Sequence, residues 1–327
     1  MKGSYHFRVK SRKILFDFTI RRNITILKGD SATGKTTLLH MMYEYLRVGK
    51  ESGYSVLAQT DYYVYLRKEV GRSWQDVLYP LTDTVIFIEE NNNFIFSQEF
   101  AEFVKNSGNY FVLVNRSPLK MLPYSIHEIY EITTDKKRGD VRESYHQFRE
   151  LYSNYPIAEN NRMDLIVTED SQAGHQFYSK AFSGHMIMGA GGNSRVLDKL
   201  QETEIKDTLV IVDGAAFGAM IEDCLEFCST RSERRITVWM PESFEYLILR
   251  SGVVSSGELE EILASVPDYV EAKEHESWEQ YFTQLLIRLT KDKAYRYSKG
   301  NLHEYYMQDR NIQKMLEIFP EEIKKHF

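Results

Sequence analysis

Ile-Thr-Ile-Leu-Lys-Gly-Asp-Ser-Ala-Thr-Gly-Lys-Thr-Thr, residues 24–37, is the stretch that decides the fold of the first half of the chain. A β-branched apolar run leads into Gly29, and a helical pattern begins near Lys35. The segment matches G-x-x-x-x-G-K-[ST] in the strand–loop–helix context that this motif requires. Small residues between the glycines let successive backbone N–H groups curl around phosphate oxygens. The segment therefore predicts a loop that binds the phosphates of a nucleotide.

Each residue of this loop has an expected part in binding ATP and Mg²⁺. The helix that starts near Lys35 directs the positive end of its dipole at the bound anion. Lys35 is expected to reach the β- and γ-phosphates as a catalytic group, and the Thr36 hydroxyl is expected to ligate Mg²⁺. A glycine turn that matches by chance is the alternative, which the flanking strand and helix disfavour. The predicted nucleotide-binding residues are Gly29, Asp30, Ser31, Ala32, Thr33, Gly34, Lys35, Thr36 and Thr37.

Two acidic residues follow the next strong strand. Residues 85–88, Val-Ile-Phe-Ile, form a short continuous apolar run, which is typical of a strand covered on both faces, and Glu89 and Glu90 come directly after it. A carboxylate at the end of the strand beside a phosphate loop holds Mg²⁺ through water, and a second one can activate the attacking water. We therefore predict Glu89 as a metal contact and Glu90 as the catalytic base. A solvated acidic strand end is the alternative.

Residues 110–114, Tyr-Phe-Val-Leu-Val, predict another buried parallel strand, and this strand ends at Asn115 and Arg116. A polar residue at this position commonly senses the γ-phosphate. Either residue is a candidate for that role, with a plain turn as the alternative, and we count Asn115 among the predicted nucleotide contacts. Guanine specificity usually rests on an Asn-Lys-x-Asp element, which residues 115–118 do not supply. ATP is therefore favoured over GTP.

Strands and helices alternate through the first 150 residues. An N-terminal hairpin over residues 5–20 leads to the loop strand, and a charged loop separates two edge strands over residues 128–133 and 144–151. The alternation predicts an α/β domain with a mostly parallel sheet. Polar residues 154–162 include a proline, so we place the boundary there, between domains 1–155 and 156–327. The other predicted elements are a strand at 54–60, a helical stretch after Asp61, and helices at 74–81 and 94–104.

The second half repeats the alternation, and acidic residues follow several of its strands. The predicted strands cover residues 164–168, 186–189, 208–212 and 236–239. Open α/β sheets place their sites beyond the carboxyl ends of the strands, and Mg²⁺ prefers hard oxygen ligands. An acid that caps the following helix is the alternative, and it applies to Asp213 in particular. The predicted metal ligands are Glu169, Asp213, Glu242 and Glu245.

These motifs resemble two known families. The hairpin and loop-strand order of residues 1–155 resemble a reduced ABC-type ATPase, although no Leu-Ser-Gly-Gly-Gln signature occurs. Acids after the first strand and a later strand resemble a toprim domain, the metal-binding module of topoisomerases, primases and OLD-family nucleases. The glycine-rich residues 191–194, the acidic helix start at 242–248 and a late Lys299-Gly300 resemble the toprim half of bacterial anti-phage proteins.

The resemblance implies an α/β protein with an N-terminal P-loop NTPase domain and a C-terminal toprim-like domain that ends in a helical tail. An ATPase followed by a toprim domain is the OLD-family architecture, and PARIS-type defence splits a comparable pair over two chains. The expected function is an ATPase whose second half binds or cleaves nucleic acid under nucleotide control, in anti-phage defence. The expected partners are nucleic acid and either further copies of the chain or a partner protein.

One position departs from the toprim pattern. Asp213-Gly214-Ala215 keeps the first acid of the Asp-x-Asp pair, and Ala215 stands in place of the second. Fewer carboxylates lower the affinity for metal, unless Asp170 or Asp223 compensates. This favours an alternative in which the toprim-like half is catalytically inert and the protein is a nucleotide-gated regulator. A small-molecule kinase built on the first domain ranks last, because no acceptor-binding motif is evident.

The remaining expectations concern the tail and the whole-chain composition. No run of about 18 apolar residues occurs and the N-terminus lacks a signal-peptide core, so we expect a cytoplasmic protein without membrane contact. A net charge of −6 allows only a local basic groove for nucleic acid. One basic run in the largely helical tail suits phosphate contacts and base stacking, although a solvated helix face is the more frequent cause of such a run. It contains Arg288, Lys291, Lys293, Arg296 and Lys299, interleaved with Tyr295 and Tyr297.

Overall fold

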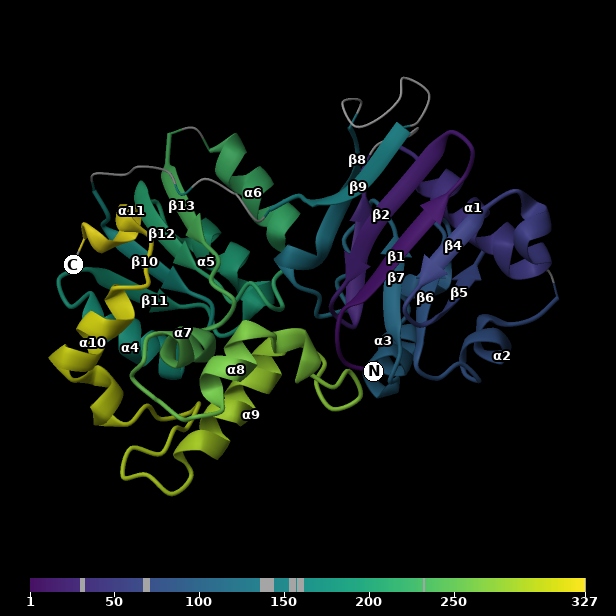
Figure 1. The fold of residues 1–327 in the computed structure, drawn as a ribbon. Coiled ribbons are helices and arrows are strands. Elements are labelled where there is room, and N and C mark those ends of the chain that lie inside the picture. The colour runs from purple at the N-terminus through teal and green to yellow at the C-terminus, as the bar shows by residue number, and fades with distance from the viewer. Residues whose placement is uncertain are drawn as a thin grey trace. The chain divides into compact units, whose positions relative to one another are not determined.

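The computed structural model describes residues 1–29, 33–66, 71–135, 144–152, 157, 162–231 and 233–326. The chain is α/β, and its contacts divide it into two compact units (Figure 1). The first unit combines Met1–Ser153 with Ser265–Glu276, and the second combines Asn154–Ala264 with Ser277–Phe327.

A nine-stranded mixed sheet forms the centre of the first unit, in the order β4-β1-β2-β9-β8-β3-β7-β6-β5. The strands β5, β6, β7, β3 and β8 run parallel to one another, and β1 pairs antiparallel with β2, as the predicted hairpin requires. The strand bounds are β1 (Tyr5–Lys10), β2 (Ile14–Ile20), β3 (Ile24–Lys28), β4 (Ser55–Ala58), β5 (Asp61–Tyr65), β6 (Thr84–Ile88), β7 (Tyr110–Val114), β8 (Ile129–Asp135) and β9 (Ser144–Glu150). Every residue of β3, β6 and β7 is buried.

Helices and short 3₁₀ turns connect these strands. Helix α1 (Lys35–Val48) follows β3 directly and buries Leu38, Leu39, Met41 and Met42 in the core of the unit. Ser73 caps α2 (Trp74–Leu78) through a capping box with Asp76, and Ser97 caps α3 (Gln98–Asn106). The 3₁₀ turns are η1 (Gly49–Ser52), η2 (Asn93–Phe96) and η3 (Ile126–Glu128).

The structure corrects two predictions for this unit. The stretch after Asp61 is strand β5, not a helix, because its Tyr-Tyr-Val-Tyr run suits a pleated surface and pairs along its whole length with β6. The strands β8 and β9 lie inside the sheet, not at an edge, because β8 pairs with β3 and β9 pairs with β2.

A short segment from late in the sequence completes the first unit. Residues 265–276 pack there, and the side chain of Asn23 donates a hydrogen bond of 3.0 Å to the carbonyl of Glu276. The Glu276 carboxylate also forms an ion pair of 2.5 Å with Lys105 of α3. The segment includes the 3₁₀ turn η5 (Val266–Asp268), and Ala272 belongs to the core of the unit.

The second unit is built on a four-stranded, wholly parallel sheet in the order β11-β10-β12-β13. Its strands are β10 (Leu165–Thr168), β11 (Met186–Gly189), β12 (Asp207–Ile211) and β13 (Arg235–Trp239). Every residue of β10 and β12 is buried, as the position of these strands inside the sheet requires. Its helices and 3₁₀ turns are α4 (Ala173–Ala181), η4 (Asn193–Arg195), α5 (Val196–Glu202), α6 (Ile221–Thr230), α7 (Phe244–Arg250), α8 (Leu259–Ala264), α9 (Trp278–Thr290), η6 (Glu304–Met307), α10 (Asp309–Leu316) and α11 (Glu321–Lys324).

The loops beyond β10 and β11 pack tightly against each other. A Cβ atom at Gly189 would lie 2.9 Å from the carbonyl oxygen of Asp170 and 3.0 Å from the Cα of Ser171, so only glycine fits there. The N–H of Gly192 donates to the carbonyl of Glu169, which ties the glycine-rich loop to the end of β10. The Asp170 carboxylate accepts hydrogen bonds from the N–H groups of Gly174 and His175 at the start of α4. Asp170 therefore caps this helix.

Candidate functional site

The segment predicted to bind phosphates lies between β3 and α1 in the first unit. Gly29 and Gly34 have φ angles of 113° and 102°, values in the left-handed region that favours glycine. The first hydrogen bond of α1 runs from the N–H of Leu38 to the carbonyl of Gly34, so the helix begins as the motif predicts. The predicted contacts Asp30, Ser31 and Ala32 lie outside the described residues.

The Lys35 side chain folds back over this loop. Its ammonium group donates to the carbonyl of Gly29 at 2.7 Å and to the hydroxyl of Thr33 at 3.0 Å. The side chain is buried, with 6% of its surface exposed, whereas Thr36 and Thr37 in the first turn of α1 are exposed. Lys35 therefore lies at the start of the exposed first turn of α1, where a helix N-terminus favours a bound anion.

The acidic pair lies at the same edge of the sheet as the loop, because β3, β7 and β6 are parallel. Glu89 and Glu90 directly follow β6, as predicted. However, β6 is not the strand beside β3, since β7 lies between them. Adjacent strands are about 4.8 Å apart, so the acids follow a strand about 10 Å from the loop strand.

Asn115 and Arg116 occupy this intermediate position at the end of β7. The Asn115 side chain is buried and donates to the carbonyl of Ser117 at 2.5 Å, so it stabilises the local turn. Arg116 forms an ion pair of 2.8 Å with Glu90, and their side chains are 53% and 29% exposed. An ion pair this exposed contributes only about 0–1 kcal/mol, so either group can change its partner at low cost. Of the two candidates, Arg116 has the charge and the exposure that an anion contact needs.

A buried carboxylate lies under the other flank of β3. Glu128 is 3% exposed, accepts a hydrogen bond of 3.0 Å from Thr25 and lies 3.5 Å from the guanidinium of Arg22. Burial raises the pKa of Glu128 to about 7, and Arg22 and Thr25 oppose this rise. Sequence reasoning did not single out Glu128, because a lone acid before a strand carries no motif.

In the second unit, Glu169 and Asp213 lie together at the carboxyl ends of β10 and β12. The backbone N–H of Asp213 donates to the Glu169 carboxylate at 2.8 Å, and the Asp213 carboxylate accepts from the N–H of Phe244 at 3.1 Å. Asp213 therefore contacts the start of α7, the helix that carries Glu245. Two of the predicted ligands are adjacent, and the third lies on the helix that one of them contacts.

A fourth carboxylate comes from the tail of the chain. We call Glu169, Asp213, Glu245 and Glu279 the acidic cluster. Tyr297 donates a hydrogen bond of 2.7 Å to one carboxylate oxygen of Glu245, while the other oxygen is buried without a hydrogen-bond partner. Lys299 donates to Glu279 of α9 at 2.5 Å. No sequence motif marks Glu279, and its position beside Lys299 follows only from the fold. Tyr297, one of the two tyrosines interleaved with the basic run, is buried and is therefore not placed for base stacking.

Burial dominates the electrostatics of the cluster. It raises the pKa of Glu169 to about 8, and the negative charges of Glu279 and Asp170 add to this effect. Burial also raises the pKa of Asp213 well above its usual range, with Glu279 and Glu169 contributing. The pKa of Glu245 is raised by burial as well, against the influence of Lys299. Burial and mutual repulsion therefore disfavour the charged form of these carboxylates, and a bound cation would stabilise that form.

Three other features of the predicted metal site do not favour metal binding: the position of Glu242, the burial of Ala215 and the arrangement of the carboxylates. Glu242 is half-buried, and its backbone carbonyl accepts from the N–H of Ala215. Ala215 is 2% exposed, so the position of the absent second acid is packed into the core. Within the described ranges, no three or more His, Cys, Asp and Glu side chains are arranged to hold a metal ion. The oxygen donors suit Mg²⁺ chemically, but they do not converge as a ready-made set of ligands.

Comparison with known proteins adds no assignment. No protein-family model, curated protein or solved structure matches this chain. The resemblance to ABC-type ATPases and toprim domains therefore stays a prediction from motifs. Among the described residues no helix is both long enough and apolar enough to cross a membrane. The cytoplasmic location, the partners and the oligomeric state stay predictions.

Proposed function

We propose that the first unit binds ATP and hydrolyses it. The observation that carries this proposal is the buried Lys35 ammonium group, held by the Gly29 carbonyl and the Thr33 hydroxyl at the start of a 14-residue helix. A buried cation, glycines with positive φ and a helix N-terminus together form a binding site for a polyphosphate. The strands β6 and β7 run parallel to β3, so the residues that follow them at the same edge, Glu89, Glu90 and Arg116, would supply the other groups that hydrolysis needs.

The roles of the individual residues follow from their positions. Lys35 would leave its contacts in the loop and bind the β- and γ-phosphates, because phosphate oxygens are stronger acceptors than a carbonyl. Thr36 and Glu89 would hold Mg²⁺, which when bound neutralises charge on the phosphates. Glu90 would accept a proton from the attacking water. Arg116 would exchange its ion pair with Glu90 for the terminal phosphate, and this exchange would release Glu90 to act as the base.

Nucleotide binding and turnover by the full chain test this proposal. Fluorescent ATP should bind the wild-type protein in the presence of Mg²⁺, and Lys35→Ala should abolish binding or weaken it strongly. Lys50→Ala is the matched control, because Lys50 is an exposed lysine in a different part of the same unit. Equal affinity of wild type and Lys35→Ala for ATP would overturn the assignment. Preference for GTP over ATP would correct the nucleotide but not the site.

For the second unit, we propose nucleic-acid binding or cleavage under nucleotide control, the activity of the anti-phage proteins that the chain resembles. The support is the buried acidic cluster, whose carboxylates are destabilised in their charged form. In particular, the Glu245 oxygen without a hydrogen-bond partner is a group that a cation would satisfy. Glu169 and Asp213 would hold the metal, which when bound supplies a Lewis acid for phosphodiester chemistry.

A second candidate function is a nucleotide-gated regulator with an inert toprim-like half. The buried Ala215 favours it, because no carboxylate stands at the second position of the acidic pair. A panel of plasmid, linear DNA and tRNA distinguishes the two, with Mg²⁺ or Mn²⁺ and with or without ATP. Cleavage lost in Asp213→Ala and in Glu169→Ala supports the nuclease. ATP turnover without cleavage in any lane supports the regulator.

A further inference from the structure

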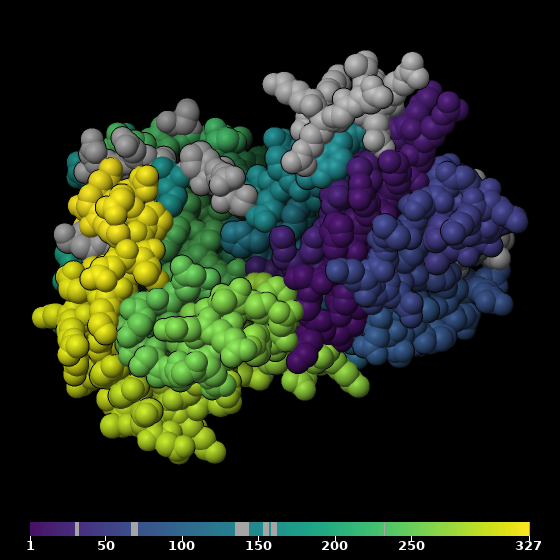
Figure 2. All heavy atoms as spheres, in the orientation of Figure 1, coloured from purple at the N-terminus to yellow at the C-terminus, as the bar shows by residue number. Residues whose placement is uncertain are grey.

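We propose that the basic loop, residues 291–300 between α9 and η6, binds the phosphate backbone of a single-stranded nucleic acid. This inference rests on the nucleic-acid function proposed for the second unit and names the surface that performs it. The loop leaves the end of α9 and projects from the second unit before the chain returns to α10 (Figure 1). In the space-filling view its atoms form the lower margin of that unit (Figure 2).

The inner side of the basic loop is fixed by hydrogen bonds. The Thr290 hydroxyl accepts from the N–H of Tyr297 at 2.9 Å, and Tyr306 donates to the carbonyl of Tyr295 at 3.0 Å. At the far end of the loop, the N–H of Ala173 donates to the carbonyl of Lys299. These bonds hold the loop in one conformation although it has no regular secondary structure. A surface fixed in this way loses little entropy when it binds a ligand.

The outer side of the loop carries positive charge. Lys291, Lys293 and Arg296 are exposed, and none of them forms an ion pair with another described residue. Asp292 is the one exposed acid within the loop. By contrast, Arg288 of the same sequence run is paired with Glu258. In a chain with a net charge of −6, three unpaired cations on a fixed loop form a local surface for a polyanion.

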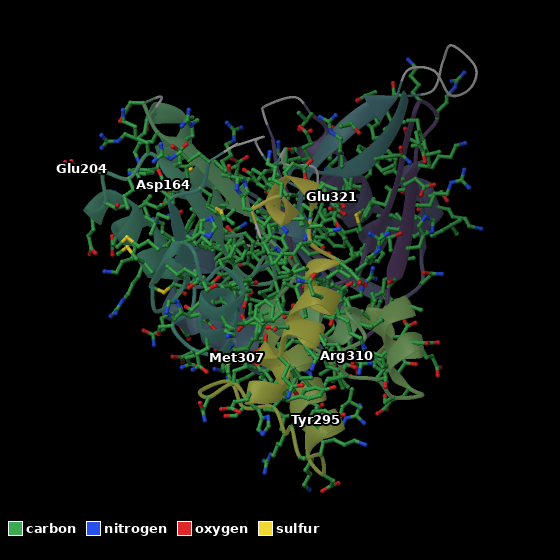
Figure 3. All side chains as sticks on the ribbon, turned by 90° about the vertical axis from the view of Figure 1, so that its left-hand side faces the viewer. Asp164, Glu204, Tyr295, Met307, Arg310 and Glu321 are labelled. Atoms are coloured by element: carbon green, nitrogen blue, oxygen red, sulfur yellow. The ribbon has the colours of Figure 1, made fainter. Side chains whose placement is uncertain are left out.

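Aromatic rings accompany these cations. Tyr295 stacks on Tyr305, with ring centroids 4.0 Å apart and an interplanar angle of 15°, and both side chains are half-buried. Figure 3 shows Tyr295 at the end of the second unit, below Arg310 of α10. Cations beside partly exposed tyrosines are typical of surfaces that bind unpaired nucleotides, in which phosphates contact the charges and bases stack on the rings.

The same side chains argue against a membrane as the polyanion. Membrane-surface segments expose large apolar side chains that enter the lipid, together with their basic residues. The exposed large hydrophobic residues of the described chain lie elsewhere, and none lies within 291–305. Two residues of the basic loop itself, Tyr297 and Lys299, contact Glu245 and Glu279 of the acidic cluster. A strand bound on the loop would therefore lie next to the acidic cluster of the same unit.

The test compares the salt dependence of binding between two triple variants of the full chain. Fluorescence anisotropy with a labelled single-stranded oligonucleotide gives the affinity at several salt concentrations. The variant Lys291→Gln/Lys293→Gln/Arg296→Gln should reduce the slope of log K against log salt by about 2, at about 0.7 per phosphate contact. The matched control Arg8→Gln/Lys13→Gln/Lys50→Gln changes the same charge at exposed positions of the first unit and should keep the wild-type slope.

The outcomes separate this inference from the proposed function. Equal slopes for wild type and the loop variant overturn the assignment of the surface, and ATP hydrolysis measured on the same samples reports independently on the first unit. Wild-type protein that hydrolyses ATP but binds no oligonucleotide overturns the inference and the nucleic-acid function together. Duplex of the same length bound as tightly as the single strand overturns the single-strand assignment. Weaker duplex binding, together with loss of single-strand affinity in Tyr295→Ala and retention in Tyr295→Phe, supports it.

Discussion

Protonation of Glu128 should make the stability of the first unit fall as the pH rises from about 5 to 8. Burial raises the pKa of Glu128 from its ordinary 4.5 to about 7 in the folded protein. Between these two values the folded state holds a proton that the unfolded state has released. Because the folded state then binds more protons, the free energy of unfolding decreases with pH. The effect is complete above pH 7, where the carboxylate is charged in both states.

The size of the effect follows from the two pKa values. Their difference of about 2.5 units corresponds to about 3 kcal/mol, at 1.36 kcal/mol per unit. Glu128→Gln keeps the acceptor for Thr25 and removes the titration. The difference in unfolding free energy between wild type and Glu128→Gln should therefore shift by about 3 kcal/mol in favour of the variant between pH 5 and pH 8.

Hydrogen exchange of β3, the strand that precedes the predicted phosphate loop, measures this change locally. Thr25 of β3 donates to Glu128, so peptides that cover residues 24–28 report on the region that the carboxylate contacts. Their protection, corrected for the intrinsic effect of pH on exchange, should fall with pH in the wild type and stay flat in Glu128→Gln. Parallel pH profiles for the two proteins would show that Glu128 does not titrate in this range, and the reasoning from burial would be wrong.

Three further predictions concern single contacts. Gly189→Ala should destabilise the second unit by about 1–3 kcal/mol in thermal unfolding, because its Cβ meets backbone at 2.9 Å, whereas Gly184→Ala, with open space around it, should be nearly neutral. Arg116→Gln should leave ATP affinity close to wild type and slow hydrolysis tenfold or more, and equal turnover would remove Arg116 from the mechanism. Tyr297→Phe should cost about 1–3 kcal/mol, because it leaves both oxygens of the buried Glu245 without a hydrogen bond; an unchanged melting temperature would contradict this.

Local features of the fold were predictable because their physical causes lie close together in the sequence. The strand, glycines and helix around Lys35 follow from about fourteen consecutive residues, and the buried runs of β6 and β7 follow from their apolar content. The run at residues 61–65 was predicted wrongly as helix, because a short run of tyrosines has no clear period. Its pairing with β6, which is a non-local contact, decides its conformation.

Local sequence patterns could not predict the order of the strands within a sheet. The strands β3, β6 and β7 are similar short apolar runs. Their residues therefore do not predict that β7 lies between β3 and β6 in the sheet. This order determines the site, because it places Arg116 between the loop strand and the acidic pair. The sequence named Glu90 and Arg116 as separate candidates, and the ion pair between them follows only from the sheet.

The basic run shows how a tertiary contact can end a helix where the sequence would continue it. Residues 291–297 contain neither glycine nor proline, and Lys, Ala and Arg are good helix formers, so a helix face was a reasonable alternative. Helix α9 nevertheless ends at Thr290, whose hydroxyl donates to the carbonyl of Leu286 and accepts from the N–H of Tyr297. The turn brings Tyr297 and Lys299 into the acidic cluster, while Lys291, Lys293 and Arg296 stay exposed. One short segment therefore supplies both the inner contacts of the cluster and the outer charge, and a longer α9 would abolish both.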